Sequence, residues 1–247
     1  MPFTSITARG SLKVSAIDST SVLIAVTANI VVGKILIACI VIDNTATADG
    51  ASSTVTIADD AVNTWVKIGE YTDSDGAASD GATIAMFASK ITTQINSAAN
   101  ITFTFSNALD KYGYCFEVTV GDGHTFGIGQ VGTNSSASGT AASIDVSVAG
   151  LPSQEYLLVG LAGAEGEDNA KDNDADYTEL LDDITSTVGA LAVNLSIHVQ
   201  TRVATLTADT CTSSAWTYTN LIAMLAALYE TDVVPYQMLE MFESTRT

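Results

Sequence analysis

The most constraining feature of this sequence is a succession of short runs of β-branched and aromatic residues, separated by Gly, Asn, Asp and Ser along nearly its whole length. Such runs are typical of β-strands. Several of them alternate strictly. In 101–105, Ile101, Phe103 and Phe105 share one face, and 191–199 has the same period of two. This alternation predicts sheets with one face on a core and the other in solvent or at an interface. The candidate strands are residues 11–17, 21–28, 35–42, 64–71, 83–90, 101–106, 113–120, 126–131, 142–148, 156–162, 191–200, 203–207 and 216–228.

Helical patterns are few, and residues 177–184 and 235–242 are each predicted to form only a turn or two of helix. The sequence therefore predicts an all-β chain. Antiparallel strand sets with apolar faces bury those faces most simply against each other, as a sandwich. We expect a large antiparallel β-sandwich over residues 1–229, jelly-roll-like if its connections are Greek keys, followed by a C-terminal arm at 230–247. Two tandem small sandwiches joined near 132–142 are the alternative.

The two halves of the chain echo each other, which suggests two related strand sets at about 1–131 and 142–229. Each set has an apolar strand, an acidic loop, an aromatic-led segment, an alternating strand, a Thr-rich strand and a long apolar strand. This order aligns Ile35 with Tyr156. The echo favours one double-layered sandwich made from two strand sets.

Charge and hydrophobicity exclude several classes of protein. The 247 residues include 28 acidic and 9 basic side chains, for a formal net charge of −19. This charge opposes binding to nucleic-acid phosphates, so no nucleic-acid partner is expected. A hydrophobic content of 47% is too high for a disordered chain.

One apolar stretch, 22–42, is long enough to span a bilayer. Lys34 near its centre would be costly in the membrane, and its residues are mostly β-branched. We expect two buried strands joined by a short turn at Gly33-Lys34, and no membrane span.

The N-terminal residues show no basic segment followed by an apolar one, so no secretory signal is expected. Cys39 and Cys115 lie in apolar runs, which predicts small buried side chains in a reducing compartment.

The residues between 165 and 183 form the most acidic segment of the chain. Within it, Asp172, Asp174 and Asp176 are spaced so that a loop could bring their carboxylates to one calcium ion. The EF-hand pattern is not met, because Tyr177 stands where that loop needs Gly. The favoured interpretation is a solvated acidic loop, with a weak calcium site at the three aspartates as the alternative. No other cofactor is expected.

Motifs of catalytic chemistry are weak, and we expect no enzyme. His124 and His198 are the only histidines, and the chain has no GxSxG motif to place a serine beside either of them. Residues 127–132 match GxGxxG, but the residues after them do not open the helix that a dinucleotide site requires. Glycines that allow an edge strand to bend are the favoured interpretation.

Two aromatic features suggest contacts with other molecules. Trp65 and Trp216 recur at similar places in the two halves, either as caps on the core or, if exposed, as a platform for sugars. The arm carries large apolar side chains outside the strand pattern, which predicts docking on the same chain or on a neighbour. The predicted interaction residues are Tyr236, Met238, Leu239, Met241 and Phe242.

Residues 35–42 (ILIACIVI), 59–65 (DDAVNTW), Tyr71 and 83–90 resemble virion structural proteins of tailed bacteriophages, which are built on jelly-roll-like β-sandwiches, and the pattern recurs more loosely as far as Tyr229. The resemblance implies a non-enzymatic capsid decoration protein, minor head protein or tail component, assembled in the host cytoplasm. It also implies other virion proteins as partners and a homo-oligomer, with a trimer favoured. The competing class is a carbohydrate- or receptor-binding module that recognises a host glycan through the tryptophans or the acidic loops.

Overall fold

The computed structural model describes residues 3–14, 17–43, 50–51, 53–73, 81–136, 143–165, 170–185, 195–216 and 221–232. Strands make up 76% of this part of the chain, and it contains no helix. The prediction of an all-β, antiparallel, sandwich-type fold is therefore confirmed. The strands are β1 (Ser5–Val14), β2 (Ser19–Ala25), β3 (Ile35–Asp43), β4 (Gly50–Ala51), β5 (Thr56–Asp59), β6 (Val66–Asp73), β7 (Ala82–Lys90), β8 (Asn100–Ala108), β9 (Lys111–Thr119), β10 (His124–Ser136), β11 (Ser143–Glu165), β12 (Asp172–Asn173), β13 (Thr178–Ile184), β14 (Leu195–Ser214) and β15 (Leu221–Asp232).

Strand β3 lies inside a six-stranded sheet, the first sheet, whose strand order is β1-β9-β3-β7-β6-β4. All residues of β3 from Ile35 to Ile42 are buried, and most of β7 and β9 is buried as well. A strand covered on both faces needs no polar side, which explains why ILIACIVI is an uninterrupted apolar run. The two faces of the first sheet pack against different partners.

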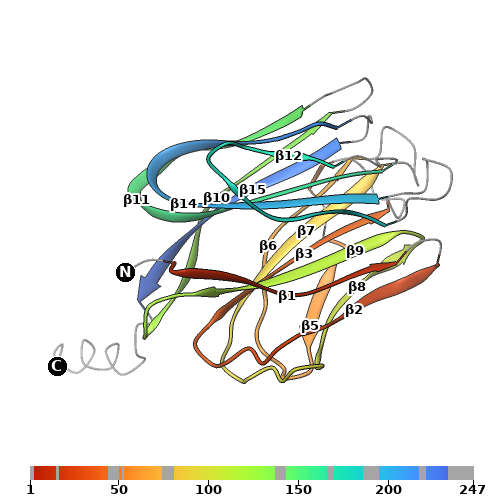
Figure 1. The fold of residues 1–247 in the computed structure, drawn as a ribbon, viewed down its shortest axis with the longest axis horizontal. Coiled ribbons are helices and arrows are strands. Elements are labelled where there is room, and N and C mark those ends of the chain that lie inside the picture. Colours follow the sequence, from red (N-terminus) through yellow and green to blue (C-terminus); the bar gives the residue numbers. More distant parts are fainter. Residues whose placement is uncertain are drawn as a thin grey trace, which may run out of the picture.

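One face of the first sheet is covered by the small sheet, β2-β8-β5, at the bottom of Figure 1. The alternating run at 101–105 belongs to β8, and Ile101, Phe103 and Phe105 all point into this core, as their spacing predicts. Phe103 meets Phe87 of the first sheet edge to face, with ring centroids 6.0 Å apart. Thr104, between these residues, faces solvent.

The other face is covered by the second sheet, whose strand order is β10-β15-β11-β14, with β12 and β13 both pairing with the far edge of β14. Strands β11 and β14 are unusually long, and together they make the U-shaped bend at the left of Figure 1. The bend falls where their register shifts, between Ala149 and Gln154. Gly150 has a φ of 72° there, a backbone conformation that glycine adopts without strain.

Beyond this bend, 143–149 of β11 and 208–214 of β14 form the overlying ribbon, which returns across the outer face of the second sheet. Val146 and Cys211 of the ribbon share an apolar cluster with Leu158 and Leu225 of the sheet below. The ribbon parts of β11 and β14 therefore cover the outer face of the second sheet, to which the other parts of the same two strands belong.

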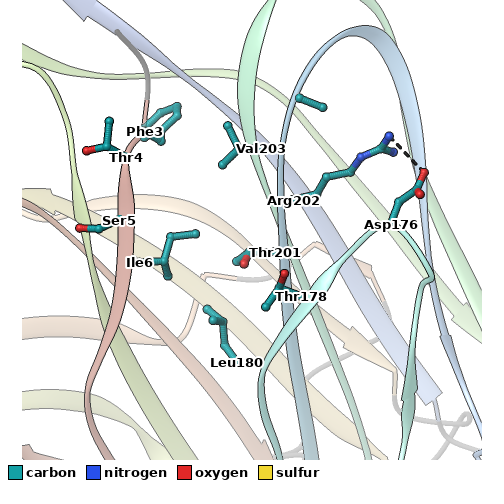
Figure 2. A pocket seen from close by; sticks show the side chains of 11 residues that line it. Phe3, Thr4, Ser5, Ile6, Asp176, Thr178, Leu180, Thr201, Arg202 and Val203 are labelled. Carbon is teal, nitrogen blue, oxygen red and sulfur yellow. Dashed lines mark ion pairs between the residues drawn. The ribbon is translucent and has the colours of Figure 1, made fainter.

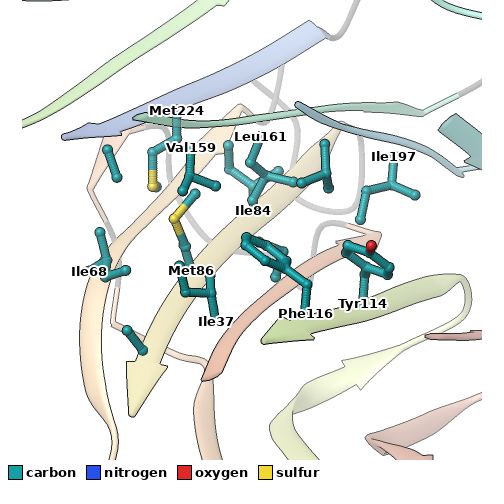
Figure 3. Close-up of a cluster of buried hydrophobic side chains, with 14 of the residues drawn as sticks. Ile37, Ile68, Ile84, Met86, Tyr114, Phe116, Val159, Leu161, Ile197 and Met224 are labelled. Atoms are coloured by element: carbon teal, nitrogen blue, oxygen red, sulfur yellow. The ribbon is translucent and has the colours of Figure 1, made fainter. Parts of the chain in front are cut away.

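The central core lies between the first and second sheets (Figure 3). Ile84, Met86 and Phe116 of the first sheet face side chains of the second sheet that include Val159 and Met224. The two backbones approach closely near Val41, because a Cβ added to Gly163 would lie 2.7 Å from a Val41 methyl carbon. The molecule is thus a stack of four β-layers with three apolar interiors, instead of the single double-layered sandwich that the sequence predicts.

The echo between the two halves has a structural counterpart, because the strand orders correspond. The first sheet contains β1-β9-β3-β7-β6, and the second contains β10-β15-β11-β14-β13. The covering layers correspond too: β2-β8-β5 matches the first part of β11, the second part of β14, and β12. Even irregularities recur, since β1 and β10 each have a register shift, as do β6 and β13. Each strand set therefore forms its own jelly-roll-like sandwich.

The two sandwiches pack face to face with their strand orders reversed. Strand β10 packs on β6, β11 on β7, and β14 on β3. At the opposite edge, Lys13 of β1 forms an ion pair with Asp183 of β13 at 3.1 Å. Because β1 corresponds to β10 and β6 to β13, the halves are related by an approximate two-fold axis.

Several local predictions were wrong. Candidate strands 142–148 and 156–162 are one continuous strand, β11, and 203–207 continues β14, because bulges and bends keep these strands paired where the sequence shows turn residues. Residues 178–184, predicted to be helical, are the edge strand β13, whose pairing with β14 overrides local preference.

The boundary between the halves also differs. Strand β10, which overlaps the predicted strand at 126–131, pairs with β15 in the second sheet instead of belonging to the first set. The two strands expected in 22–42 are present as β2 and β3, but they lie in different sheets and 26–34 joins them in place of a short turn. Within the described residues, no helix is long and apolar enough to cross a membrane.

The central core gives a direct test of this arrangement. Phe116→Ala removes a fully buried ring between the two main sheets and is expected to lower the free energy of unfolding by about 3–5 kcal/mol. Leu23→Ala, at a side chain 47% exposed on the small sheet, is the control and should cost less than about 1 kcal/mol. Urea denaturation measures both, and equal losses would contradict the assignment of Phe116 to the main interface.

Candidate functional site

The predicted calcium ligands lie at the far edge of β14, on β12 and the turn that follows it. The Asp174 carboxylate accepts hydrogen bonds from the backbone N–H groups of Asp176 and Thr212, both at 3.2 Å. Asp176 is bound to the Arg202 guanidinium at 3.1 Å, and Asp172 is exposed in β12. Among the residues that the structure describes, no three Asp, Glu, His or Cys side chains are grouped to hold a metal ion. Two of the three carboxylates are instead occupied by protein donors.

Beside Asp176 lies groove 1, an open cavity of about 610 Å³ (Figure 2). It lies between the start of β1 and the strands β13 and β14. Its side chains include the hydroxyls of Ser5, Thr178 and Thr201 and the apolar groups of Ile6 and Val203. Groove 1 thus has a mixed lining that can accept hydrogen bonds as well as apolar contacts.

Arg202 is the basic group among the described residues that line groove 1. Its guanidinium bridges Asp176 at 3.1 Å and Asp209 at 2.9 Å. Tyr177 donates a hydrogen bond to the same Asp209 carboxylate at 3.0 Å. Burial, with smaller effects from Cys211 and Asp209, raises the pKa of the Tyr177 phenol, so Tyr177 remains a donor across the physiological range. The Asp176 side chain is 64% exposed, and it forms the accessible edge of this network.

A second cavity, groove 2, has a volume of about 450 Å³ and lies between the start of β10 and the edges of β6 and β7. Val66, Phe126 and Ile128 provide its apolar wall. The Lys90 ammonium caps it by donating hydrogen bonds to the carbonyl oxygens of Gly33 and His124. Burial lowers the pKa of Lys90, although the charges of Glu230 and Asp122 oppose this shift.

The two grooves occupy equivalent positions under the approximate two-fold relation. Groove 1 is formed by β1, β13 and β14, and groove 2 by the corresponding strands β10, β6 and β7. Twisted sheets that pack face to face diverge at their corners, and these grooves are two such corners. Neither groove was predicted from the sequence, because each depends on how the two halves pack.

A serine–histidine pair that sequence reasoning missed lies inside the second half. His198 Nδ1 is 2.6 Å from Ser213 Oγ, and the Trp216 indole N–H donates to the same oxygen at 2.8 Å. With Trp216 as donor, the Ser213 hydroxyl donates to Nδ1, which leaves the proton of neutral His198 on Nε2. Glu179 lies 3.9 Å from Nε2. The three residue types resemble a catalytic triad.

The surroundings of this pair differ from those of a reactive serine. His198 and Ser213 are only 1% and 3% exposed, and the alternating pattern puts His198 on the strand face that was expected in solvent or at an interface. Burial, followed by the charge of Lys171, lowers the pKa of His198 to about 4. The adjacent described residues enclose a cavity of only about 10 Å³, too small for a substrate. The observed arrangement works as a buried polar network that fixes β14 to the segment around Trp216.

His124, the other histidine, is the first residue of β10. Its Nδ1 lies 3.4 Å from carboxylate oxygens of both Glu230 and Asp232, near the end of β15. Glu230 also accepts a hydrogen bond from the backbone N–H of Gly121 at 2.6 Å. These contacts hold the end of β15 against the turn that precedes β10.

The glycines of the GxGxxG match lie on edge strand β10, as the preferred interpretation predicts. A Cβ on Gly127 would overlap the Tyr229 ring, and one on Gly132 would overlap the Ser147 carbonyl oxygen. The register shift between Ile128 and Gln130 leaves Gly129 at the bulge. These glycines allow close contact with β15 and with the overlying ribbon, and no helix follows them in the described chain.

The tryptophans serve the interior and do not form an exposed platform. Trp216 is 3% exposed, and Trp65 packs against the core between the first and small sheets. The indole N–H of Trp65 donates to Asp59 at 2.8 Å, and Asp59 also accepts the backbone N–H of Asn63 at 3.2 Å. Asn63 in turn accepts the backbone N–H of Thr93 at 2.8 Å. The DDAVNTW stretch is thus a hydrogen-bonded connection between β5 and β6 with a structural role.

All three cysteines are free and buried, as predicted. Burial raises the pKa of each thiol, that of Cys115 to about 12, so none is a thiolate at neutral pH.

The predicted interaction residues Tyr236, Met238, Leu239, Met241 and Phe242 lie outside the described residues. No protein-family model matches the sequence, and no curated protein matches it either.

The pKa of His198 leads to a prediction for stability against pH. At pH 7 His198 is neutral in both states, but below about 6.5 the unfolded chain binds a proton that the folded chain binds only near pH 4. As pH falls through this window, His198 should remove about 3 kcal/mol of the free energy of unfolding. His198→Gln keeps an acceptor for Ser213 and should lose about that much less between pH 7 and 4 than the wild type in urea titrations. Equal losses in the two proteins would refute this role.

Proposed function

We propose that this chain is a non-enzymatic structural component of a tailed-phage virion, either a capsid decoration or minor head protein or a part of the tail. It acts through contacts with copies of itself, favoured as a trimer, and with other virion proteins. Assembly takes place in the host cytoplasm. The support comes from the fold and from two of its surfaces.

The fold supports the proposal by analogy. Jelly-roll sandwiches form viral capsid domains as well as lectins and other proteins, so architecture narrows the classes without choosing among them. Here two jelly-roll-like sandwiches are packed into one four-layered body. The choice among these classes of protein depends on the surfaces that the four-layered fold exposes.

The observation that carries the proposal is that both ends of the stack are strand faces rich in hydroxyl groups. The outer face of the small sheet presents Ser21, Leu23, Thr56 and Thr104, with no charged side chain among them. The outer face of the overlying ribbon is its equivalent: there Ser147 and Thr210 are hydrogen-bonded at 2.8 Å, and the one carboxylate beside them, that of Asp145, accepts a hydrogen bond from the Thr212 hydroxyl at 2.7 Å. Interface cores are depleted in charged residues, because burying unpaired charge is costly. The outer face of the small sheet therefore suits repeated packing against neighbouring subunits.

Native mass spectrometry of the purified chain tests this proposal. We expect a closed homo-oligomer, with three copies favoured, which persists at about 1 M salt because its contacts are uncharged. Thr104→Arg on the small sheet should weaken self-association at least tenfold. Thr207→Arg, at an exposed position near the bend of β14, is the control and should leave the mass unchanged. A single-chain mass at every concentration would overturn the proposal.

Groove 1 favours one other candidate, a carbohydrate- or receptor-binding module. Its exposed Asp176 carboxylate, the Arg202 guanidinium and the threonine hydroxyls are groups that hydrogen-bond sugar hydroxyls. The tryptophans expected to stack on sugars are unavailable for this, because Trp216 is buried and Trp65 packs on the core. The structural proposal is preferred for this reason.

A glycan array separates the two candidates. The structural proposal predicts no bound glycan above background. If a glycan binds, Asp176→Asn should reduce its signal at least tenfold and Asp172→Asn, a control on the same segment, should not. That pattern would establish groove 1 as a sugar site and displace the structural proposal.

A further inference from the structure

Groove 2 differs from groove 1 at two corresponding places. Val66 of groove 2 lies one residue before Lys67, after which the register of β6 shifts, and the residue at the same place in β13 is Thr178, one residue before Glu179. Ile128 precedes the register shift in β10, and its equivalent in β1 is Ala8. At these two places groove 2 carries larger apolar side chains than groove 1, whose own exposed apolar side chain is Val203.

These apolar side chains are left uncovered by the described chain. Val66 is 43% exposed and Ile128 is 36% exposed, and Phe126 beside them is only partly buried. Large apolar groups that gather in one concave surface mark a contact site more often than scattered ones do. The remaining question is which segment covers them.

The chain itself supplies a segment at this place. Strand β15 ends at Asp232, which pairs with His124, and His124 directly precedes Thr125 of groove 2. Fifteen residues follow Asp232, and nearly half of them are large and apolar: Val233, Val234, Tyr236, Met238, Leu239, Met241 and Phe242. At up to about 3.5 Å per residue, the four positions from Asp232 to Tyr236 span up to about 14 Å, enough to bring the later residues over the groove.

We propose that residues 233–247 dock in groove 2 of their own chain, with apolar side chains between Tyr236 and Phe242 covering Val66, Phe126 and Ile128. The occupant is the tail of the same molecule, because it starts beside the groove and needs no partner to reach it. Groove 1, with Thr178 and Ala8 at the matching positions, is not its site. This docking does not depend on the function proposed above.

Crosslinking in the full-length chain tests the proposal. The double variant Ile128→Cys with Met238→Cys is treated with a short bismaleimide, and mass spectrometry of the digested monomer locates the link. The native cysteines are at most 2% exposed and do not compete. The matched control is Val203→Cys with Met238→Cys, because Val203 is 40% exposed in groove 1. We expect an intrachain link in most molecules of the first variant and at least fivefold less in the control.

Three results would overturn the proposal: equal links in the two variants, links between chains, or no link in either. Limited chymotrypsin digestion gives a second readout without new cysteines. Ile128→Asp should speed cleavage after Tyr236 and Phe242 at least fivefold, while Val203→Asp should leave it unchanged. An unchanged rate in Ile128→Asp would also count against docking in groove 2.

Discussion

The apolar contact between the two main sheets is the constraint on which the rest of the structure depends. It buries the central part of one face of each sheet, with β7 against β11 and β3 against β14. The first sheet is covered by the small sheet on its other face, and the second by its own overlying ribbon. Without the central contact each half would expose a broad apolar surface, and the corners that form the two grooves would not exist.

The strands that pack on both sides were the easiest to predict from sequence. A short uninterrupted run that is rich in β-branched residues, such as ILIACIVI, favours a buried strand, and β3 occupies the residues that this run predicts, with one residue more. The order of the strands and their bends were harder. The turn residues near Gly150 suggest an end to the strand, whereas tertiary pairing carries β11 through a bend to Glu165. Alternation predicted a polar outer face around His198, but the fold covers that face with the ribbon.

The candidate sites were equally hard to predict, because they depend on contacts between residues that are distant in sequence. Acidic residues close together in sequence favoured a solvated loop, with a weak calcium site as the alternative, whereas in the structure Asp174 accepts hydrogen bonds from backbone N–H groups and Asp176 pairs with Arg202. The Ser213–His198 pair comes from positions fifteen residues apart on one long strand, and only the return of that strand brings their side chains together. No local motif signals such a contact. The grooves are further removed from sequence, because each combines strands from both halves.

The approximate two-fold relation makes this chain, in effect, a dimer whose two protomers are covalently joined. The turn at 120–123 between β9 and β10 is the tether, so the two sandwiches meet at a high effective concentration however dilute the protein is. Separate protomers would need a concentration high enough to pair, and either one alone would carry an open apolar face. Joining them also frees the two copies to diverge, which is how one corner can carry Val66 and Ile128 while the other carries Thr178 and Ala8.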